Sequence, residues 1–317
     1  MIAGRPKLLE VTLSLKEELI NALRKIVSEE NIHINEEMSR HTTFRTGGPA
    51  SLFLRTEDEK QAFDAVRFLR QQGEPFFILG NGSNLLVSDK GYEGVIISLD
   101  KLDDLRIEED TTIVAQAGVL NSSIASFARE NSLSGFEFAA GIPGTIGGAM
   151  IMNAGAYGGE MKNITESVRA ISPEGEICVL SGKDCDFGYR TSALKRGGFV
   201  VVSARLSLTG GNKDDISALM TELALKRKEK QPLEYPSAGS TFKRPEGYFA
   251  GKLIEDAGLR GFSVGGAQVS EKHCGFVINR DNATSTDIYE LITEVKRRVL
   301  ESSGVTLEPE VVMLGDF

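Results

Sequence analysis

Two glycine-rich segments of this 317-residue sequence have residue types and spacing that could bind a ligand. The first, GNGSN (80–84), follows a strand-like segment and begins like the G-x-G turn that binds a dinucleotide. Such a turn needs a third glycine where Leu85 stands and must open a helix, whereas LLV (85–87) is typical of a strand. Two interpretations remain: consecutive backbone N–H groups that bind an anion together with the Ser83 hydroxyl, or a glycine-rich hairpin.

The second segment, GIPGTIGGAMIMNAGAYGGE (141–160), has no Lys after its glycines, which excludes a Walker phosphate loop. A charge-free backbone that allows close approach suits a flat neutral ring, such as a flavin, whose phosphates lie elsewhere. Tight packing between two domain backbones is the alternative. The uncharged stretch 138–157 has the length of a membrane span, but its five glycines and one proline predict irregular buried backbone instead.

The sequence has few candidate residues for metal binding or for hydrolysis. The histidines His33, His41 and His273 are not at metal-ligand spacing, so no metal site is predicted. No G-x-S-x-G motif is present, so a hydrolase triad of that type would have no nucleophile. The dense basic run KRKEK (226–230) lies at the expected end of a helix, where it either complements the helix dipole or binds a phosphate.

The net charge and the cysteine content of the sequence restrict the partners that the protein is expected to bind and the cell compartment in which it is expected. A net charge of −9 argues against a general surface for nucleic acid or anionic membrane, and neither nucleic-acid binding nor membrane insertion is expected. Three cysteines without a C-x-x-C pair give no disulfide framework. The first residues lack the apolar core of a secretory signal, and a reducing cytoplasm is the predicted location.

Hydrophobic spacing predicts the elements that must position these loops. Helices are expected at 14–30, 56–72, 121–130, 214–231 and 286–302, and strands at 51–55, 75–79, 94–99, 111–118, 168–172, 176–180, 199–208, 275–279 and 305–314. A capping box of Thr56 and Glu59 is expected to open the second helix. Because helices and strands interleave without strict βαβ alternation, the α+β class is predicted, with a domain boundary near 210–230.

Several segments, taken together and in order, resemble one family. They are HTTFRTGGPA (41–50), GNGSNLLV (80–87), the second glycine segment (141–160), GYRTS (188–192), SAGSTFKRP (237–245), GGAQVSEKHCGFVIN (265–279) and LEPEV (307–311). The family is UDP-N-acetylenolpyruvoylglucosamine reductase, and the resemblance covers about residues 10–315. No room for an extra tyrosine-bearing loop exists between Thr191 and Lys230, so the chain resembles the shorter class of the family.

The resemblance implies a vanillyl-alcohol-oxidase (PCMH) type FAD-binding fold, with two α+β subdomains and a third α+β substrate domain. The implied FAD-binding subdomains are 1–100 and 101–212, the substrate domain is 213–305, and a C-terminal strand within 306–317 returns to the first subdomain. It also implies that NADPH reduces FAD, which then reduces the enolpyruvyl group of the UDP-sugar to UDP-N-acetylmuramate, a peptidoglycan precursor. The partners are therefore small molecules, and a monomer is compatible with the sequence.

The resemblance also assigns residues. Neither glycine loop contains His or Cys, so non-covalent FAD is expected. Its implied binding residues are Arg45, Thr46, Gly47, Gly48, Gly80, Asn81, Gly82, Ser83, Asn84, Leu85, Gly141, Ile142, Pro143, Gly144, Thr145, Gly147, Gly148, Asn153 and Gly155. The implied substrate-binding residues, assigned by position, are Tyr189, Arg227, Lys230, Lys243, Arg244 and His273.

Three residues match the catalytic positions of the family: Arg190, Ser240 and Glu310. Hydride addition to the enolpyruvyl group produces an enolate, which Arg190 is expected to stabilise and Ser240 to protonate. Glu310 can help only if it is protonated or if it polarises Arg190, because an ionised acid repels the enolate. Two alternatives remain: an FAD enzyme of the same fold that oxidises a small alcohol, and a nucleotide-sugar binding protein without chemistry.

Overall fold

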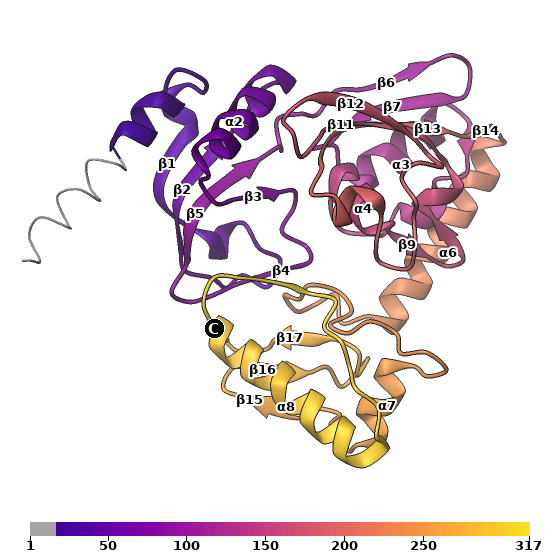
Figure 1. The fold of residues 1–317 in the computed structure, drawn as a ribbon. Coiled ribbons are helices and arrows are strands. Elements are labelled where there is room, and N and C mark those ends of the chain that lie inside the picture. The colour runs from indigo at the N-terminus through magenta and orange to yellow at the C-terminus, as the bar shows by residue number, and fades with distance from the viewer. Residues whose placement is uncertain (1–16) are drawn as a thin grey trace, which may run out of the picture.

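Three main sheets organise residues 17–317, the part of the chain that this computed structural model describes (Figure 1). The first has four strands in the order β1-β2-β5-β3, in which β1 is antiparallel to β2, and β2 and β3 are parallel to β5. The strands are β1 (Ile32–Glu37), β2 (Pro49–Arg55), β3 (Phe76–Leu79) and β5 (Tyr92–Ser98). Alternating side chains of β2 enter two cores: Leu52 and Leu54 pack on one face, and Phe53 packs on the other.

Helix α2 (Glu59–Gln72) follows β2, and its N-cap lies two residues later than the capping box predicts. Asp58 caps it, because its side chain accepts the Gln61 N–H at 2.7 Å. The Thr56 hydroxyl instead donates to the Ser98 carbonyl at 3.1 Å, so the prediction of Thr56 as the cap is wrong. Of the helix predicted at 14–30, residues 17–23 are helical, residues 24–27 form a turn, and the first three lie outside the described residues.

The second sheet has five antiparallel strands in the order β12-β11-β13-β7-β6. They are β6 (Leu105–Glu108), β7 (Thr112–Gln116), β11 (Thr165–Ile171), β12 (Ile177–Ser181) and β13 (Val200–Ser207). Helix α4 (Ile146–Met152) packs on β13 and β7. This helix lies inside the glycine-rich stretch predicted to be irregular, and that prediction is wrong because Gly147 lets the helix approach Ala117 closely.

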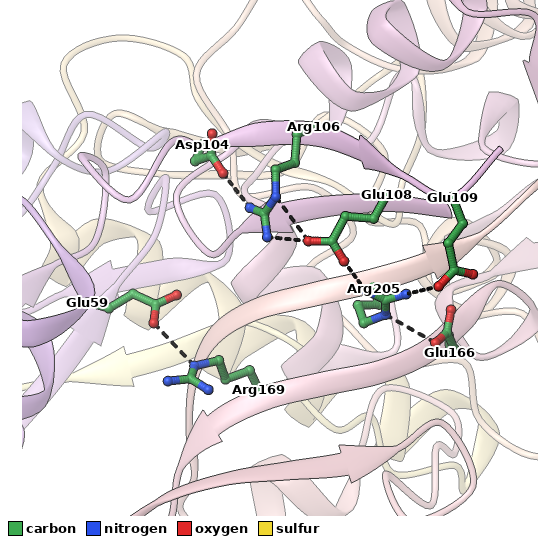
Figure 2. Close-up of polar contacts among 8 residues, drawn as sticks. All are labelled: Glu59, Asp104, Arg106, Glu108, Glu109, Glu166, Arg169 and Arg205. Carbon is green, nitrogen blue, oxygen red and sulfur yellow. Dashed lines mark hydrogen bonds and ion pairs between the residues drawn. The ribbon is translucent and has the colours of Figure 1, made fainter. Parts of the chain in front are cut away.

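Buried apolar residues and polar contacts join the unit built on the first sheet and the unit built on the second sheet into one body. One continuous core contains Leu54 and Val66 of the first unit together with Val168 and Val202 of the second. Figure 2 shows the Arg169 side chain of β11 reaching Glu59 of α2 at 3.2 Å. It also shows a surface network in which Arg205 of β13 pairs with Glu108 of β6 and Glu166 of β11. Exposed pairs of this kind add little stability individually, so the shared core is the main link.

The third unit contains a three-stranded antiparallel sheet in the order β15-β16-β17. Its elements are α7 (Ala250–Asp256), β15 (Ser263–Val264), β16 (Ala267–Val269), β17 (Val277–Asn279) and α8 (Ser285–Ser303). Asp89, from the first unit, accepts the backbone N–H groups of Ser285 and Thr286 at 2.9 and 2.8 Å. A residue of the first unit therefore caps the first turn of α8.

Two connections complete the architecture. Helix α6 (Lys213–Lys230) packs against α3 (Asn121–Glu130) and runs from the second unit toward the third (Figure 1). Strand β18 (Val312–Leu314) pairs in parallel with β4 (Leu85–Val87), directly after the first glycine loop.

The remaining short elements are η1 (Glu29–Asn31), η2 (Met38–Arg40), β8 (Leu133–Ser134), η3 (Glu137–Ala139), β9 (Gly155–Ala156), β10 (Gly159–Glu160), η4 (Met161–Asn163), α5 (Ala193–Arg196) and β14 (Thr209–Gly210). Among residues 17–317 there is no helix with the length and apolar character of a membrane span.

Candidate active site

The two glycine loops, which come from different sheets, lie against each other. The Ser83 hydroxyl donates to the Pro143 carbonyl at 3.1 Å. A Cβ placed on Gly80 would lie 2.6 Å from Thr145 Oγ1, and one on Gly144 would lie 2.9 Å from Ser83 Oγ. Because both contacts are shorter than real Cβ atoms show, a side chain at either glycine would displace the hydroxyl of Thr145 or Ser83. The two loops therefore approach each other closely at the junction of the first two units.

The first loop presents unpaired backbone donors. Among the described residues, the N–H groups of residues 80–84 donate to no protein acceptor. Gly82 has φ +58°, and a Cβ there would lie 1.9 Å from the His41 carbonyl oxygen, so its lack of a side chain allows this loop to pack against residues 41–43. Consecutive free amides of this kind form a concave anion-binding surface. Of the two interpretations that the sequence leaves open, this geometry favours the anion site over the hairpin.

The segment 45–48 adds to the same surface. The Thr46 hydroxyl oxygen is buried and has no hydrogen-bond partner within residues 17–317. Arg45 has φ +59° and an exposed side chain. Gly48 approaches the Asp89 carbonyl so closely that a Cβ would lie 2.1 Å from its oxygen. Free amides, an orphaned hydroxyl and an uncharged glycine wall together fit a flavin dinucleotide.

Three of the residues predicted to bind the cofactor have other surroundings. Leu85 is buried at the start of β4 and pairs with Val312, so only its backbone faces the loop. Gly155 lies in β9, paired with Glu160 of β10. The Asn153 side chain is 2% exposed, and all its polar atoms are engaged by neighbouring protein groups. Asn153 therefore has no free N–H to offer a ligand.

Arg190 and Glu310, which are far apart in the sequence, meet at the edge of the third unit. Arg190 Nε lies 2.7 Å from Glu310 Oε1, with side-chain exposures of 23% and 13%. The Nε–H makes no aligned hydrogen bond in the described structure, so charge rather than a linear bond holds the pair. Within residues 17–317 the two Nη groups of Arg190 form no hydrogen bond, which leaves a planar pair of donors available for a carboxylate.

Backbone contacts fix Glu310 from two sides. Its N–H donates to the Thr241 carbonyl at 2.8 Å, and its carbonyl accepts the Asn84 side-chain amide at 3.1 Å. Burial raises the pKa of the Glu310 carboxyl, while the charges of Arg190, Lys195 and Lys243 oppose that rise. Asn84 thus joins the first glycine loop directly to the backbone of Glu310.

Lys195 is a residue that the sequence reasoning does not single out. Its Nζ lies 3.3 Å from Met152 Sδ, and its pKa is lowered by burial and by the charge of Lys243. Its charge also acts on Glu310. Lys195 stands five residues after Arg190, and because this spacing belongs to no recognisable motif, the sequence contains no signal for it.

Ser240 opens into a pocket of about 360 Å³ that Arg190 and Glu310 also line. The preceding Gly239 has φ +76°, and the following Thr241 is buried. Thr241 is held at both ends, because its N–H donates to Gly275 O at 2.9 Å and its hydroxyl accepts the Val277 N–H at 2.9 Å. All three predicted catalytic side chains therefore face one cavity.

The predicted substrate-binding residues divide into two groups. Tyr189, Arg244 and His273 line the pocket, and Tyr189 Oη accepts the Arg244 backbone N–H at 3.0 Å. Burial lowers the pKa of His273, whose Nδ1 accepts the Gly275 N–H at 3.0 Å and is therefore unprotonated. Lys243 pairs with Glu308 at 3.0 Å, outside the pocket lining. The pocket also contains residues that the sequence reasoning does not single out: Phe242, Phe249, Ala250, Gly251, Lys252, Glu255, Arg260, Lys272, Cys274 and Gly275.

Arg227 of the basic run on α6 lies at the second glycine loop, and no residue of the run lines the pocket. A Cβ on Gly141 would lie 3.1 Å from Arg227 Cδ. Burial lowers the pKa of Arg227, which has no carboxylate partner in the described part of the chain, and its Nε donates to Gln231 at 2.9 Å. Lys226 pairs with Glu222 on the same helix, and Lys230 is exposed. Arg227 is therefore the member of the run that is placed to meet an anion at the glycine loop.

Known proteins similar to this chain agree with this geometry. A family model described as UDP-N-acetylenolpyruvoylglucosamine reductase, C-terminal domain, matches residues 231–314, and one described as FAD binding domain matches residues 50–181. A protein named UDP-N-acetylenolpyruvoylglucosamine reductase from Caldanaerobacter subterraneus subsp. tengcongensis is 50% identical over 302 residues, 95% of this chain and 100% of that protein. This chain belongs to the UDP-N-acetylenolpyruvoylglucosamine reductase family.

Two further members of this reductase family extend the comparison. A Clostridioides difficile protein of the same name is 50% identical over 295 residues, which are 93% of this chain and 97% of that protein. The crystal structure of the UDP-N-acetylenolpyruvylglucosamine reductase from Thermus caldophilus superimposes with a TM-score of 0.76 at 34% identity, covering 90% of this chain and 98% of that one. The predicted family, the α+β FAD-binding fold and the FAD cofactor are confirmed.

Proposed function

We propose that this chain catalyses the NADPH-dependent reduction of UDP-N-acetylenolpyruvoylglucosamine to UDP-N-acetylmuramate, a step of peptidoglycan precursor synthesis. The observation that carries the proposal is the convergence of Arg190, Glu310 and Ser240 on one pocket of about 360 Å³. Asn84 of the first glycine loop bonds to the Glu310 carbonyl. An arginine fork, a buried acid and a hydroxyl together match the needs of an enolate intermediate.

The residues that would hold FAD are the free amides of 80–84, the Thr46 hydroxyl and the glycine wall of 141–148. Bound FAD would supply hydride transfer between NADPH and the enolpyruvyl group. Arg227 lies beside Gly141 as an unpaired cation, which suits a phosphate of a nucleotide ligand. Neither loop contains a His or Cys, which supports non-covalent binding.

Arg190 binds the substrate carboxylate in this proposal. Its Nη groups are free while its Nε faces Glu310, so the fork is oriented before substrate arrives. The negative charge that develops on the carboxylate during reduction is then stabilised by a cation that needs no reorganisation. Burial raises the pKa of Glu310 and so increases the share of its protonated form, which donates to the enolate, whereas the ionised form holds Arg190 in place.

Ser240 supplies the proton. Its side chain is exposed into the pocket, and within residues 17–317 the hydroxyl forms no hydrogen bond that would have to be broken. An enolate carbon is basic enough to take a proton from a hydroxyl held at the right place in a site from which water is excluded. Tyr189, Arg244 and His273 contact the UDP-sugar in this arrangement, and Lys230 and Lys243 are proposed to attract its diphosphate from the rim.

A visible spectrum and two half-reactions test the proposal. NADPH is expected to bleach the flavin of the purified protein, and the UDP-enolpyruvyl sugar is expected to restore it. Ser240→Ala should bleach at the normal rate and reoxidise roughly 10²–10⁴-fold more slowly, the usual contribution of a positioned acid. A colourless protein, or a wild-type flavin that the sugar fails to reoxidise, would overturn the function. Equal loss of both half-reactions in Ser240→Ala would overturn its role as proton donor.

We further propose three domains: 1–100 and 101–212 for the cofactor, and 213–305 for the substrate, with 306–317 returning to the first. In this division α6 is the connection, because its first turns pack on α3 and its end leads to the third unit. Three free cysteines support a reducing cytoplasm as the location. A monomer is proposed, because the three catalytic residues come from one chain.

A further inference from the structure

The turn that carries Arg190 has a strained backbone. Gly188 and Thr191 exchange backbone hydrogen bonds at 3.0 and 3.3 Å, which leaves Tyr189 and Arg190 as a two-residue turn. Arg190 has φ +55°, a left-handed conformation that costs a residue with a side chain roughly 1–2 kcal/mol. Such strain persists only where surrounding contacts hold it in place.

Those contacts come from the C-terminal end of α4. Ser192 is fully buried, and its hydroxyl donates to the Ile151 carbonyl at 2.8 Å. On the other side of the turn, Asn153 Nδ2 donates to the Gly188 carbonyl at 3.1 Å. The Arg190 turn is therefore bound at both ends to residues that end the same helix.

The Asn153 amide is itself held in one orientation. Its Nδ2 also donates to Glu160 Oε2 at 2.6 Å, and its Oδ1 accepts the Lys162 N–H at 3.0 Å. Lys162 Nζ pairs with Glu160 at 2.8 Å, and hydrogen bonds from Lys162 and Asn153 lower the pKa of Glu160 despite burial. An ionised, fixed acceptor thus orients the amide that holds Gly188.

The other end of α4 is anchored at the second glycine loop. The Ile146 and Gly147 N–H groups donate to the carbonyls of Val119 and Ala117 at 2.9 and 3.0 Å. Two turns of helix therefore separate the glycine loop from the group that fixes Arg190. A rigid helix of this length holds the Gly188–Thr191 turn at a fixed place relative to the glycine loop. None of its own side chains has to touch the reacting atoms.

We propose that Asn153 is a positioning residue that sets the place of the Arg190 guanidinium through the Gly188–Thr191 turn, with α4 as the connection to the glycine loop. This inference rests on the proposed function of Arg190. It also changes the role expected for Asn153, from a contact to the cofactor to a contact that orients a catalytic side chain.

Asn153→Gly is the test variant. Asn153 has φ +44°, so glycine keeps the left-handed backbone without strain and removes only the amide. Displacing the Arg190 side chain by about 1 Å is expected to slow flavin reoxidation by the sugar roughly ten- to a hundredfold. The rate of NADPH bleaching and the FAD dissociation constant should stay at wild-type values. Asn35→Gly is the matched control, because Asn35 also has positive φ, at +54°, but is exposed on β1.

A double-variant cycle with Arg190→Lys separates positioning from a general structural role. If Asn153 acts through Arg190, Asn153→Gly should cause little further loss of reoxidation rate in the Arg190→Lys background. Ser192→Ala, which releases the other end of the turn, should reproduce the selective loss even if Asn153→Gly fails to fold. Weaker FAD binding in a folded Asn153→Gly protein, additive losses in the cycle, or wild-type reoxidation in both variants would overturn the inference. A wild-type enzyme that the sugar cannot reoxidise would overturn the proposed function instead.

Discussion

Gly82→Ala is expected to destroy the anion-binding surface of the first glycine loop. Gly82 has φ +58°, and the added Cβ would lie 1.9 Å from the His41 carbonyl oxygen. Since real Cβ contacts stay above 3.0 Å, segments 41–43 and 80–84 must separate by about 1 Å. That movement also breaks the bond from the Thr43 N–H to the Gly82 carbonyl, now 3.2 Å.

Backbone strain and broken hydrogen bonds set the size of the effect. A left-handed alanine costs roughly 1–2 kcal/mol, and the broken backbone hydrogen bond costs about 1 kcal/mol, so the unfolding free energy should fall by roughly 2–3 kcal/mol. Amides that move by about 1 Å no longer form one or more of their charged hydrogen bonds to a diphosphate, each worth roughly 1.5–3 kcal/mol. The FAD dissociation constant should therefore rise roughly ten- to a hundredfold.

Gly73→Ala is the matched control for this test. Gly73 ends α2 with φ +68°, but no atom of residues 17–317 other than its chain neighbours lies within 4 Å of a Cβ placed there. It should lose roughly 1–2 kcal/mol of stability, from backbone strain alone, and bind FAD normally. Fluorescence titration of flavin-free protein measures both affinities, and thermal unfolding measures stability. If Gly82→Ala and Gly73→Ala bind FAD equally well, the assignment of the 80–84 amides to the diphosphate is refuted.

Three further substitutions probe other contacts of the site. Asp89→Asn removes the charge that caps α8 and should lower stability by about 1 kcal/mol near pH 7. Burial tends to raise the Asp89 pKa, but hydrogen bonds from Thr286 and the backbone outweigh burial and lower that pKa. The difference in Tm between the wild type and Asp89→Asn should therefore shrink as the pH falls below 3.8. Arg227→Met removes a half-buried cation that has no carboxylate partner within residues 17–317, so the ligand-free protein should melt at a higher temperature while a nucleotide ligand binds roughly tenfold more weakly. Lys195→Met removes a charge that lowers the Glu310 pKa, so the limb of the pH–rate profile due to Glu310 should move to higher pH; an unmoved limb would exclude this coupling.

Periodicity predicts most elements because their buried faces are regular. Helix α3 occupies 121–130 as expected, and the hairpin of β11 and β12 turns at Pro173-Glu174-Gly175. Helix α4 is not predicted because its glycines have low helix propensity. The packing of Gly147 on Ala117 outweighs that local preference in the folded chain. The predicted cap of α2 is misplaced because Thr56 finds a carbonyl partner across the sheet, which sequence spacing does not reveal.

The site is predictable only in part. The glycine loops are visible as candidates, but their meeting depends on two sheets that pack side by side. Arg190 and Glu310 are paired only through family resemblance, because 120 residues of chain separate them without any periodic signal. Lys252, Arg260 and Lys272 enter the pocket from a helix and loops of the third unit, so no motif joins them. The position of Asn153 beside glycines resembles a ligand loop, whereas its buried hydrogen bonds define its role.

The parallel pairing of β18 with β4 has a consequence for the order in which the site can form. Ser88 and Asp316, joined by a hydrogen bond of 2.6 Å, lie 228 residues apart. During translation, residues 80–87 leave the ribosome long before residues 307–314, so the first glycine loop must wait for its partner strand and for Glu310. A nascent chain therefore cannot present a complete reaction centre, and loss of residues 307–314 would remove Glu310 together with the contacts that this segment makes to Asn84 and Leu85.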